Sequence, residues 1–125
     1  MGTWGTDLWE DDFSCDVQED WNHFMDEGMA PEKATQLILN EWLVELDDYD
    51  DDEERQPYEA LLYIAVAALQ LENEALQNTV KNKAIQLIDA GGDLPLWEDG
   101  DPADYEKRKK VLADFRSQLE KAKAN

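Results

Sequence analysis

Acidic side chains are the chemically active groups that this sequence supplies in number, and they are concentrated in its first half. Nineteen of the 31 Asp and Glu residues lie in residues 1–54, together with one of the 11 Lys and Arg residues, so that this segment has a net charge of −18. Residues 55–125 have a net charge of −2. Carboxylates at this density can bind a divalent cation or a basic protein.

A run of acids around residues 47–54 suggests the first of these chemistries. It has the ligand spacing of a calcium-binding EF-hand loop, in which positions 1, 3, 5 and 12 are Asp48, Asp50, Asp52 and Glu59. Position 6 is Glu53, although the sharp turn of such a loop requires glycine there. A divalent-metal protein built on this loop is therefore the alternative hypothesis, and a solvated acidic turn competes with it.

Recognition of a basic protein partner is the second chemistry, and the sequence favours it. A negative surface that meets a positive cleft speeds encounter, and immunity proteins and nucleic-acid mimics use this principle. We predict a non-enzymatic acidic interaction protein of that immunity-like or mimic kind; the competing interpretation is that the charge only maintains solubility. Trp97 follows a predicted glycine stop and is expected to be exposed. The predicted partner-binding residues are Asp11, Asp12, Asp16, Glu19, Asp20, Asp47, Asp48, Asp50, Asp51, Asp52, Glu53, Glu54 and Trp97.

Residues suited to catalysis are scarce. The chain has one His and one Cys, and His23 with Asp20 forms only half of a di-metal carboxylate motif. Cys15 lies two helical turns from His23, too far for a nucleophile–base pair. No Ser-His-Asp set, phosphate-binding glycine loop or zinc-ligand spacing is present. We therefore predict no enzymatic activity and no cofactor.

Composition also restricts the partners and the location. Direct nucleic-acid binding needs a broad surface of clustered basic residues. A chain with a net charge of −20 is not expected to have such a surface. The longest apolar run, Leu61–Leu69, is about half the ~20 residues that span a bilayer, and no signal segment is visible at the start. A cytoplasmic protein without membrane contact is expected, and its oligomeric state stays open.

Helices are the elements that must position these side chains. Apolar residues recur three or four positions apart, and no alternating stretch indicates a strand. The predicted helices cover about residues 11–27, 31–46, 58–71 and 73–90, and a fifth runs from 102 through at least 119, with Pro57 restarting the chain after the acidic run. The third is apolar nearly all round and should be central. The predicted fold is all-α, a single domain over residues 1–125 in an irregular bundle of about five helices.

The last predicted helix is basic, with Lys107, Arg108, Lys109 and Lys110 in succession. If it covers the acidic half, the charge is used internally; if it does not, the charge is available to a partner. The sequence leaves both arrangements open.

Both ends and the middle of the chain carry motifs that can be compared with a known family. The chain opens Met1-Gly2-Thr3-Trp4-Gly5-Thr6, and further motifs are the alanine-rich run 64–72, the segment 92–97 and the segment 107–115. These resemble a family of small bacterial proteins, a domain of unknown function, that opens M-G-x-W-G-x-G-x-F. The sequence differs at Asp7, where the family has Gly, at Trp9, where it has Phe, and at Leu71, where Trp is common. The resemblance implies a single bacterial cytoplasmic domain and brings no activity, catalytic residue or cofactor.

Overall fold

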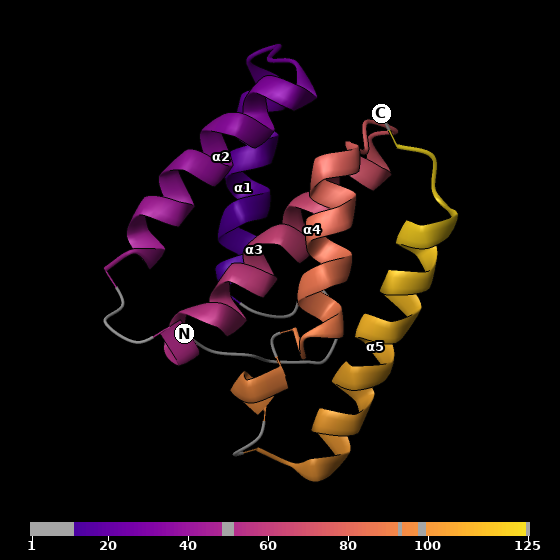
Figure 1. Ribbon diagram of the computed structural model, residues 1–125. Helices are drawn as coiled ribbons and strands as arrows, with labels where there is room; N and C mark the ends of the chain where they lie inside the picture. The colour runs from indigo at the N-terminus through magenta and orange to yellow at the C-terminus, as the bar shows by residue number, and fades with distance from the viewer. Residues whose placement is uncertain (1–11, 49–51, 93, 98–99, 125) are drawn as a thin grey trace.

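Helices account for the secondary structure of the described residues. The computed structural model describes residues 12–48, 52–92, 94–97 and 100–124. In chain order the elements are α1 (Asp12–Asp26), α2 (Pro31–Leu46), α3 (Asp52–Glu72), α4 (Asn78–Asp89), the 3-10 helix η1 (Leu94–Trp97) and α5 (Pro102–Lys121) (Figure 1). No strand occurs in these ranges, which confirms the all-α class. None of the helices in them combines the length and apolarity that crossing a membrane requires.

Helix α3 lies at the centre of the fold, as its composition predicts. Every side chain from Ile64 to Gln70 is buried, because α1, α2 and α4 all pack against this helix. In Figure 1, α1 and α2 lie on one side of α3, and α4 and α5 lie on the other, with α5 packed on α4. The molecule therefore has an acidic pair of helices and a basic helix on opposite sides of an apolar one.

Each outer helix contributes one apolar face to the core. The buried residues recur three, four or seven positions apart, as expected for one side of a helix. They are Val17 and Trp21 in α1, Ala34 and Ile38 in α2, Val80, Ala84 and Leu87 in α4, and Leu112, Phe115 and Leu119 in α5.

The start of α3 differs from the prediction. Pro57 was expected to restart the chain, but the helix begins at Asp52 and contains Pro57 in its second turn. Negatively charged residues are stabilising in the first turn of a helix, where the backbone dipole is positive, and residues 52–54 are all acidic. Proline so close to the helix start removes only one interior hydrogen bond.

The start of α4 also differs, because α3 and α4 are separated by a turn that no glycine or proline marks. The turn reverses at Glu74, whose φ of 56° is in the left-handed region, and Ala75 N donates to Gln70 O at 2.8 Å. The side chain of Gln70 then accepts a 3.0 Å hydrogen bond from the backbone N of Gln77, the residue before α4. The predicted helix over 73–90 is thus wrong at its start, since a buried side chain of α3 fixes the break.

Helix α5 begins as predicted, and a hydrogen bond links its end to α4. Asp101 caps it by accepting a 2.9 Å hydrogen bond from Ala103 N. Near its end, Lys81 of α4 donates to the carbonyl oxygen of Ala122 at 2.9 Å.

Candidate functional site

The predicted partner-binding residues that the structure describes lie on α1 and directly after α2. We call them the front carboxylates: Asp16, Glu19 and Asp20 of α1, and Asp47 and Asp48 after α2. All are exposed except Asp20, which is half-buried. The three on α1 are spaced three and four positions apart or adjacent, so they share one side of that helix.

Helix α2 runs back beside α1 and brings the two groups of front carboxylates toward each other. The link between the helices is a 3.0 Å hydrogen bond from Trp42 Nε1 to Asp20 Oδ2. Trp42 lies near the end of α2, so the residues that follow α2 come toward the first half of α1. The fold thus gathers carboxylates from two segments of the sequence on one side of α3.

Few cations neutralise the front carboxylates. Arg55 Nη1 lies 3.0 Å from Asp47 Oδ1. Asp16, Glu19 and Asp48 form no ion pair with any residue of the described ranges. Asp47 and Asp48 also follow the C-terminus of α2, where the helix dipole is negative and no basic residue occupies the last turn. A cation placed there would be stabilised by both the carboxylates and the helix end.

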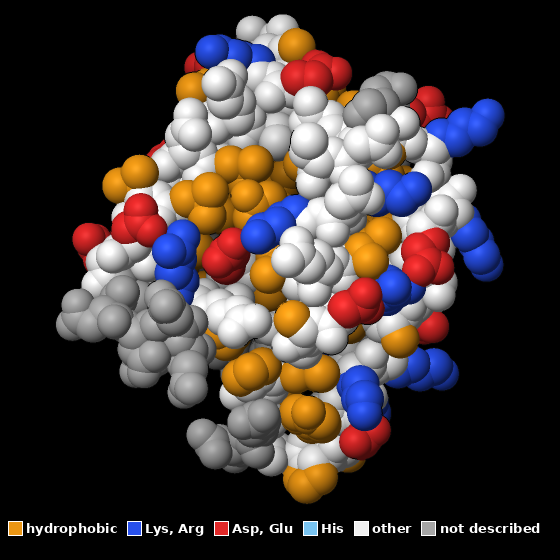
Figure 2. All heavy atoms as spheres, viewed as in Figure 1, with side chains coloured by type: hydrophobic (Ala, Val, Ile, Leu, Met, Phe, Trp, Pro, Cys, Tyr) orange, Lys and Arg blue, Asp and Glu red, His pale blue; other side chains and the backbone are white. Residues whose placement is uncertain are grey.

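The basic helix does not cover the front carboxylates. Within the described part of the chain, α5 packs on α4 and η1, whereas α1 and α2 pack on each other and on α3. Figure 2 shows Lys and Arg side chains lying along α5, on the right of the view. Arg116 of α5 pairs locally, with Asp89 of α4 and with Glu120 of its own helix. For the described residues of the acidic half, the basic helix therefore lies apart from the carboxylates.

Trp97 is a correction to the predicted partner-binding set. It was expected to be exposed in a loop, but it lies in η1 and is only 8% exposed. The guanidinium carbon of Arg108 lies 5.9 Å from the centre of its ring, a cation–π contact between η1 and α5. Trp97 therefore holds η1 on α5 and presents little surface to a partner.

Arg108 differs in burial from the lysines beside it in the sequence. It was grouped with three lysines as one basic run, yet it is 1% exposed while Lys107, Lys109 and Lys110 are exposed. A signal for this existed, because Arg108 lies four positions before Leu112 on the apolar stripe of α5.

From its fifth position onward, the segment predicted to form a calcium loop is helical. Because α3 begins at Asp52, residues 52–59 cannot form the extended part of a twelve-residue loop around an ion. Glu59 lies within α3, where its carboxylate is 3.6 Å from Lys83 Nζ and 4.0 Å from Arg55 Nε. Among the described residues no three His, Cys, Asp or Glu side chains are placed to hold a metal ion together.

Glu59 instead belongs to a charged cluster that links α3 with α4. Lys83 Nζ also lies 5.9 Å from the ring centre of Tyr63. Burial raises the pKa of the Tyr63 hydroxyl, and the Glu59 carboxylate raises it further. No signal in the sequence marks this cluster, because Lys83 joins it from a different helix than Glu59 and Tyr63.

The remaining predicted site residues lie outside what the structure describes. This applies to Asp11, Asp50 and Asp51, and to the side chains of Asp12, Asp52, Glu53 and Glu54. The backbone of Asp12, Asp52, Glu53 and Glu54 is helical.

Comparison of the chain with protein-family models, with curated proteins and with solved structures found no match in any of the three. The resemblance to small bacterial proteins stays a prediction, and the functional argument rests on charge and geometry.

Proposed function

We propose that the protein is a non-enzymatic interaction protein that binds a basic protein partner through its front carboxylates. The observation that carries this proposal is the separation of charge across α3: helix α5 packs on α4, so its cations do not cover the front carboxylates. A domain that needed acidic residues only for its own stability would pair more of them with its cations.

The chemistry of the partner follows from that of the carboxylates. Arg and Lys pair with carboxylate and phosphate oxygens alike, so a cleft that binds phosphates also accepts a carboxylate surface. The net charge of −20 adds a long-range field that speeds encounter with such a cleft. An immunity-like protein or nucleic-acid mimic would use the front carboxylates in this way.

The test compares two variants that each remove three negative charges. The front variant carries Asp16→Asn, Glu19→Gln and Asp48→Asn, which are exposed and form no ion pair with described residues. The control variant carries Glu72→Gln, Glu106→Gln and Asp114→Asn, exposed residues at the end of α3 and on α5. The matched change in net charge separates a local surface from a general field.

Immobilised protein is used to capture a basic partner from cell extract, and the dissociation constant of the purified pair is measured by calorimetry at rising salt. We expect the front variant to bind between about threefold and a hundredfold more weakly, because an exposed ion pair contributes about 0.2–1 kcal/mol. Salt should weaken the wild-type complex. Three results would each contradict the proposal. They are a partner retained equally well at low and high salt, a loss of affinity in the control variant as large as in the front variant, and the absence of any basic partner.

A further inference from the structure

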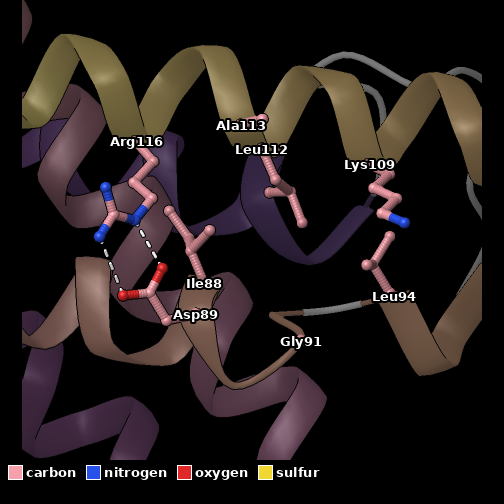
Figure 3. Close-up of a pocket in the computed structure, with 8 residues that line it drawn as sticks. All are labelled: Ile88, Asp89, Gly91, Leu94, Lys109, Leu112, Ala113 and Arg116. Carbon is pink, nitrogen blue, oxygen red and sulfur yellow. Dashed lines mark hydrogen bonds and ion pairs between the residues drawn. The ribbon is translucent and has the colours of Figure 1, made fainter.

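A cavity of about 350 Å³ lies between the end of α4, η1 and α5. Its volume is within the range of small-molecule sites, which is about 300–1,000 Å³. Figure 3 shows the side chains of Ile88, Leu94 and Leu112 lining it from these three elements. The apolar wall can therefore contact a ligand from more than one direction.

Two features fix the width of the cavity. At one end Arg116 of α5 donates to both carboxylate oxygens of Asp89, with Nε–Oδ1 at 2.5 Å and Nη2–Oδ2 at 3.0 Å. The turn after α4 passes close to α5 at Gly92, which has a φ of 55°, and a Cβ there would lie 2.9 Å from Leu112 Cδ1. The ion pair and the turn hold α4 and α5 in fixed relation, so the cavity is formed without a ligand.

The side chains that line the cavity carry more positive than negative charge. Asp89 and Arg116 match each other, and Lys109 has no carboxylate of the described residues within ion-pair distance. Figure 3 shows Lys109 reaching from α5 toward Leu94, at the end of the cavity away from the Asp89–Arg116 pair. The lining of the cavity is therefore net positive, although the protein as a whole has a net charge of −20.

We propose that this cavity binds a small aliphatic carboxylate. The hydrocarbon chain lies on Ile88, Leu94 and Leu112, and the carboxylate pairs with Lys109 Nζ. An amine of the same size would bring a cation toward Lys109, and an alcohol would lose the charged contact. The proposal goes beyond the interaction function, since none of the front carboxylates lines the cavity.

The experiment titrates the protein with hexanoate, and uses 1-hexanol as a probe with the same chain and no charge. Binding is followed by calorimetry and by backbone amide chemical shifts. We expect saturable binding of one hexanoate per chain, with shifts at Gly91, Leu94 and Ala113, and weaker binding of hexanol. Lys109→Gln should weaken hexanoate binding about two- to fivefold, the value of an exposed ion pair, and leave hexanol binding unchanged.

Two further variants keep the result interpretable. Lys107→Gln removes an exposed cation of α5 that does not line the cavity, so it should leave hexanoate binding unchanged. Ala113→Met places a larger side chain at the exposed border of the cavity and should abolish binding of both probes, with circular dichroism confirming that α5 is intact. Hexanol that binds as tightly as hexanoate, equal losses in the two lysine variants, or unaltered binding to Ala113→Met would overturn the proposal.

Discussion

Helices α1 and α2 pack on α3 mainly through apolar side chains and leave most of their described charges in solvent, whereas α4 and α5 are joined by an ion pair as well as by a core. In the first pair, Trp21 and Ile38 are buried while Asp16 and Glu19 are exposed without an ion pair to described residues. In the second pair, the Asp89–Arg116 ion pair crosses between the helices. Charge in the back half thus contributes to the assembly of the helices, whereas most of the described charge in the front half stays in solvent.

The strongest test of this comparison is to separate apolar from charged contributions on one helix. Trp21→Ala should lower the free energy of unfolding by about 3–5 kcal/mol, because it empties a fully buried aromatic site between α1 and the core. Asp16→Asn, on the exposed side of the same helix, should change it by less than about 0.5 kcal/mol. Urea unfolding of both variants measures the two values. A large loss in Asp16→Asn would mean that the front charges also hold the fold together.

A second test examines the ion pair of the back half through its pH dependence. The hydrogen bonds from Arg116 lower the pKa of Asp89 below its ordinary value of 3.8. The folded state thus binds this proton less readily than the unfolded state, so the contribution to stability is present above pH 3.8 and is lost as the pH falls through the lowered value.

The Asp89→Asn variant should therefore melt at a lower temperature than the wild type at pH 7, and the difference should shrink as the pH falls below 3.8 and vanish below the lowered pKa of Asp89. Thermal unfolding followed by circular dichroism gives both melting temperatures. Asp114→Asn removes an exposed carboxylate of α5 that forms no ion pair with the described residues, and serves as the control. A difference between wild type and Asp89→Asn that is independent of pH would show that the ion pair contributes nothing to the attachment of α5.

The smallest expected effect comes from repulsion among the front charges. Glu41 and Glu45 are exposed and four positions apart on α2, an arrangement of like charges that destabilises a helix. Glu45→Gln should therefore stabilise the protein by about 0.2–0.5 kcal/mol at low salt. Urea unfolding in 10 mM and in 1 M salt measures this gain, which salt should remove by screening. A gain that persists in 1 M salt would point to helix propensity as its cause.

The parts of the fold that the sequence predicts are those with local signals. Pro31 and the Asp101–Pro102 pair mark helix starts, because a proline at the first helical position and an acidic cap act on neighbouring backbone groups. The starts of α3 and α4 were missed for a different reason. Acids before Pro57 favour an earlier start, and the break before α4 depends on Gln70, a residue buried by other helices.

The candidate site divides in the same way. That Asp16 and Glu19 are exposed follows from the position of Val17 and Trp21 on the buried side of α1. Which carboxylates acquire a cation depends on how distant helices pack, as Arg55 beside Asp47 shows. The burial of Trp97 depends on Arg108 and α5, and the cavity exists only once α4, η1 and α5 have met. Tertiary contacts of this kind leave no periodic trace in the sequence.

The amide of Gln70 has a consequence for the uniqueness of the packing. Its nitrogen donates to Thr35 Oγ1 of α2 at 2.8 Å and to Gln77 Oε1 at 2.9 Å, and its oxygen accepts from the Gln77 backbone. The smooth, alanine-rich surface of α3 would otherwise let its neighbours slide by one helical turn at little cost in apolar contact. Such a slide would bury the donors and acceptors of this amide without partners, at about 1–3 kcal/mol for each group. One polar side chain thus selects a single register for three helices, and so sets where the acidic pair α1–α2 and the cavity lie relative to each other.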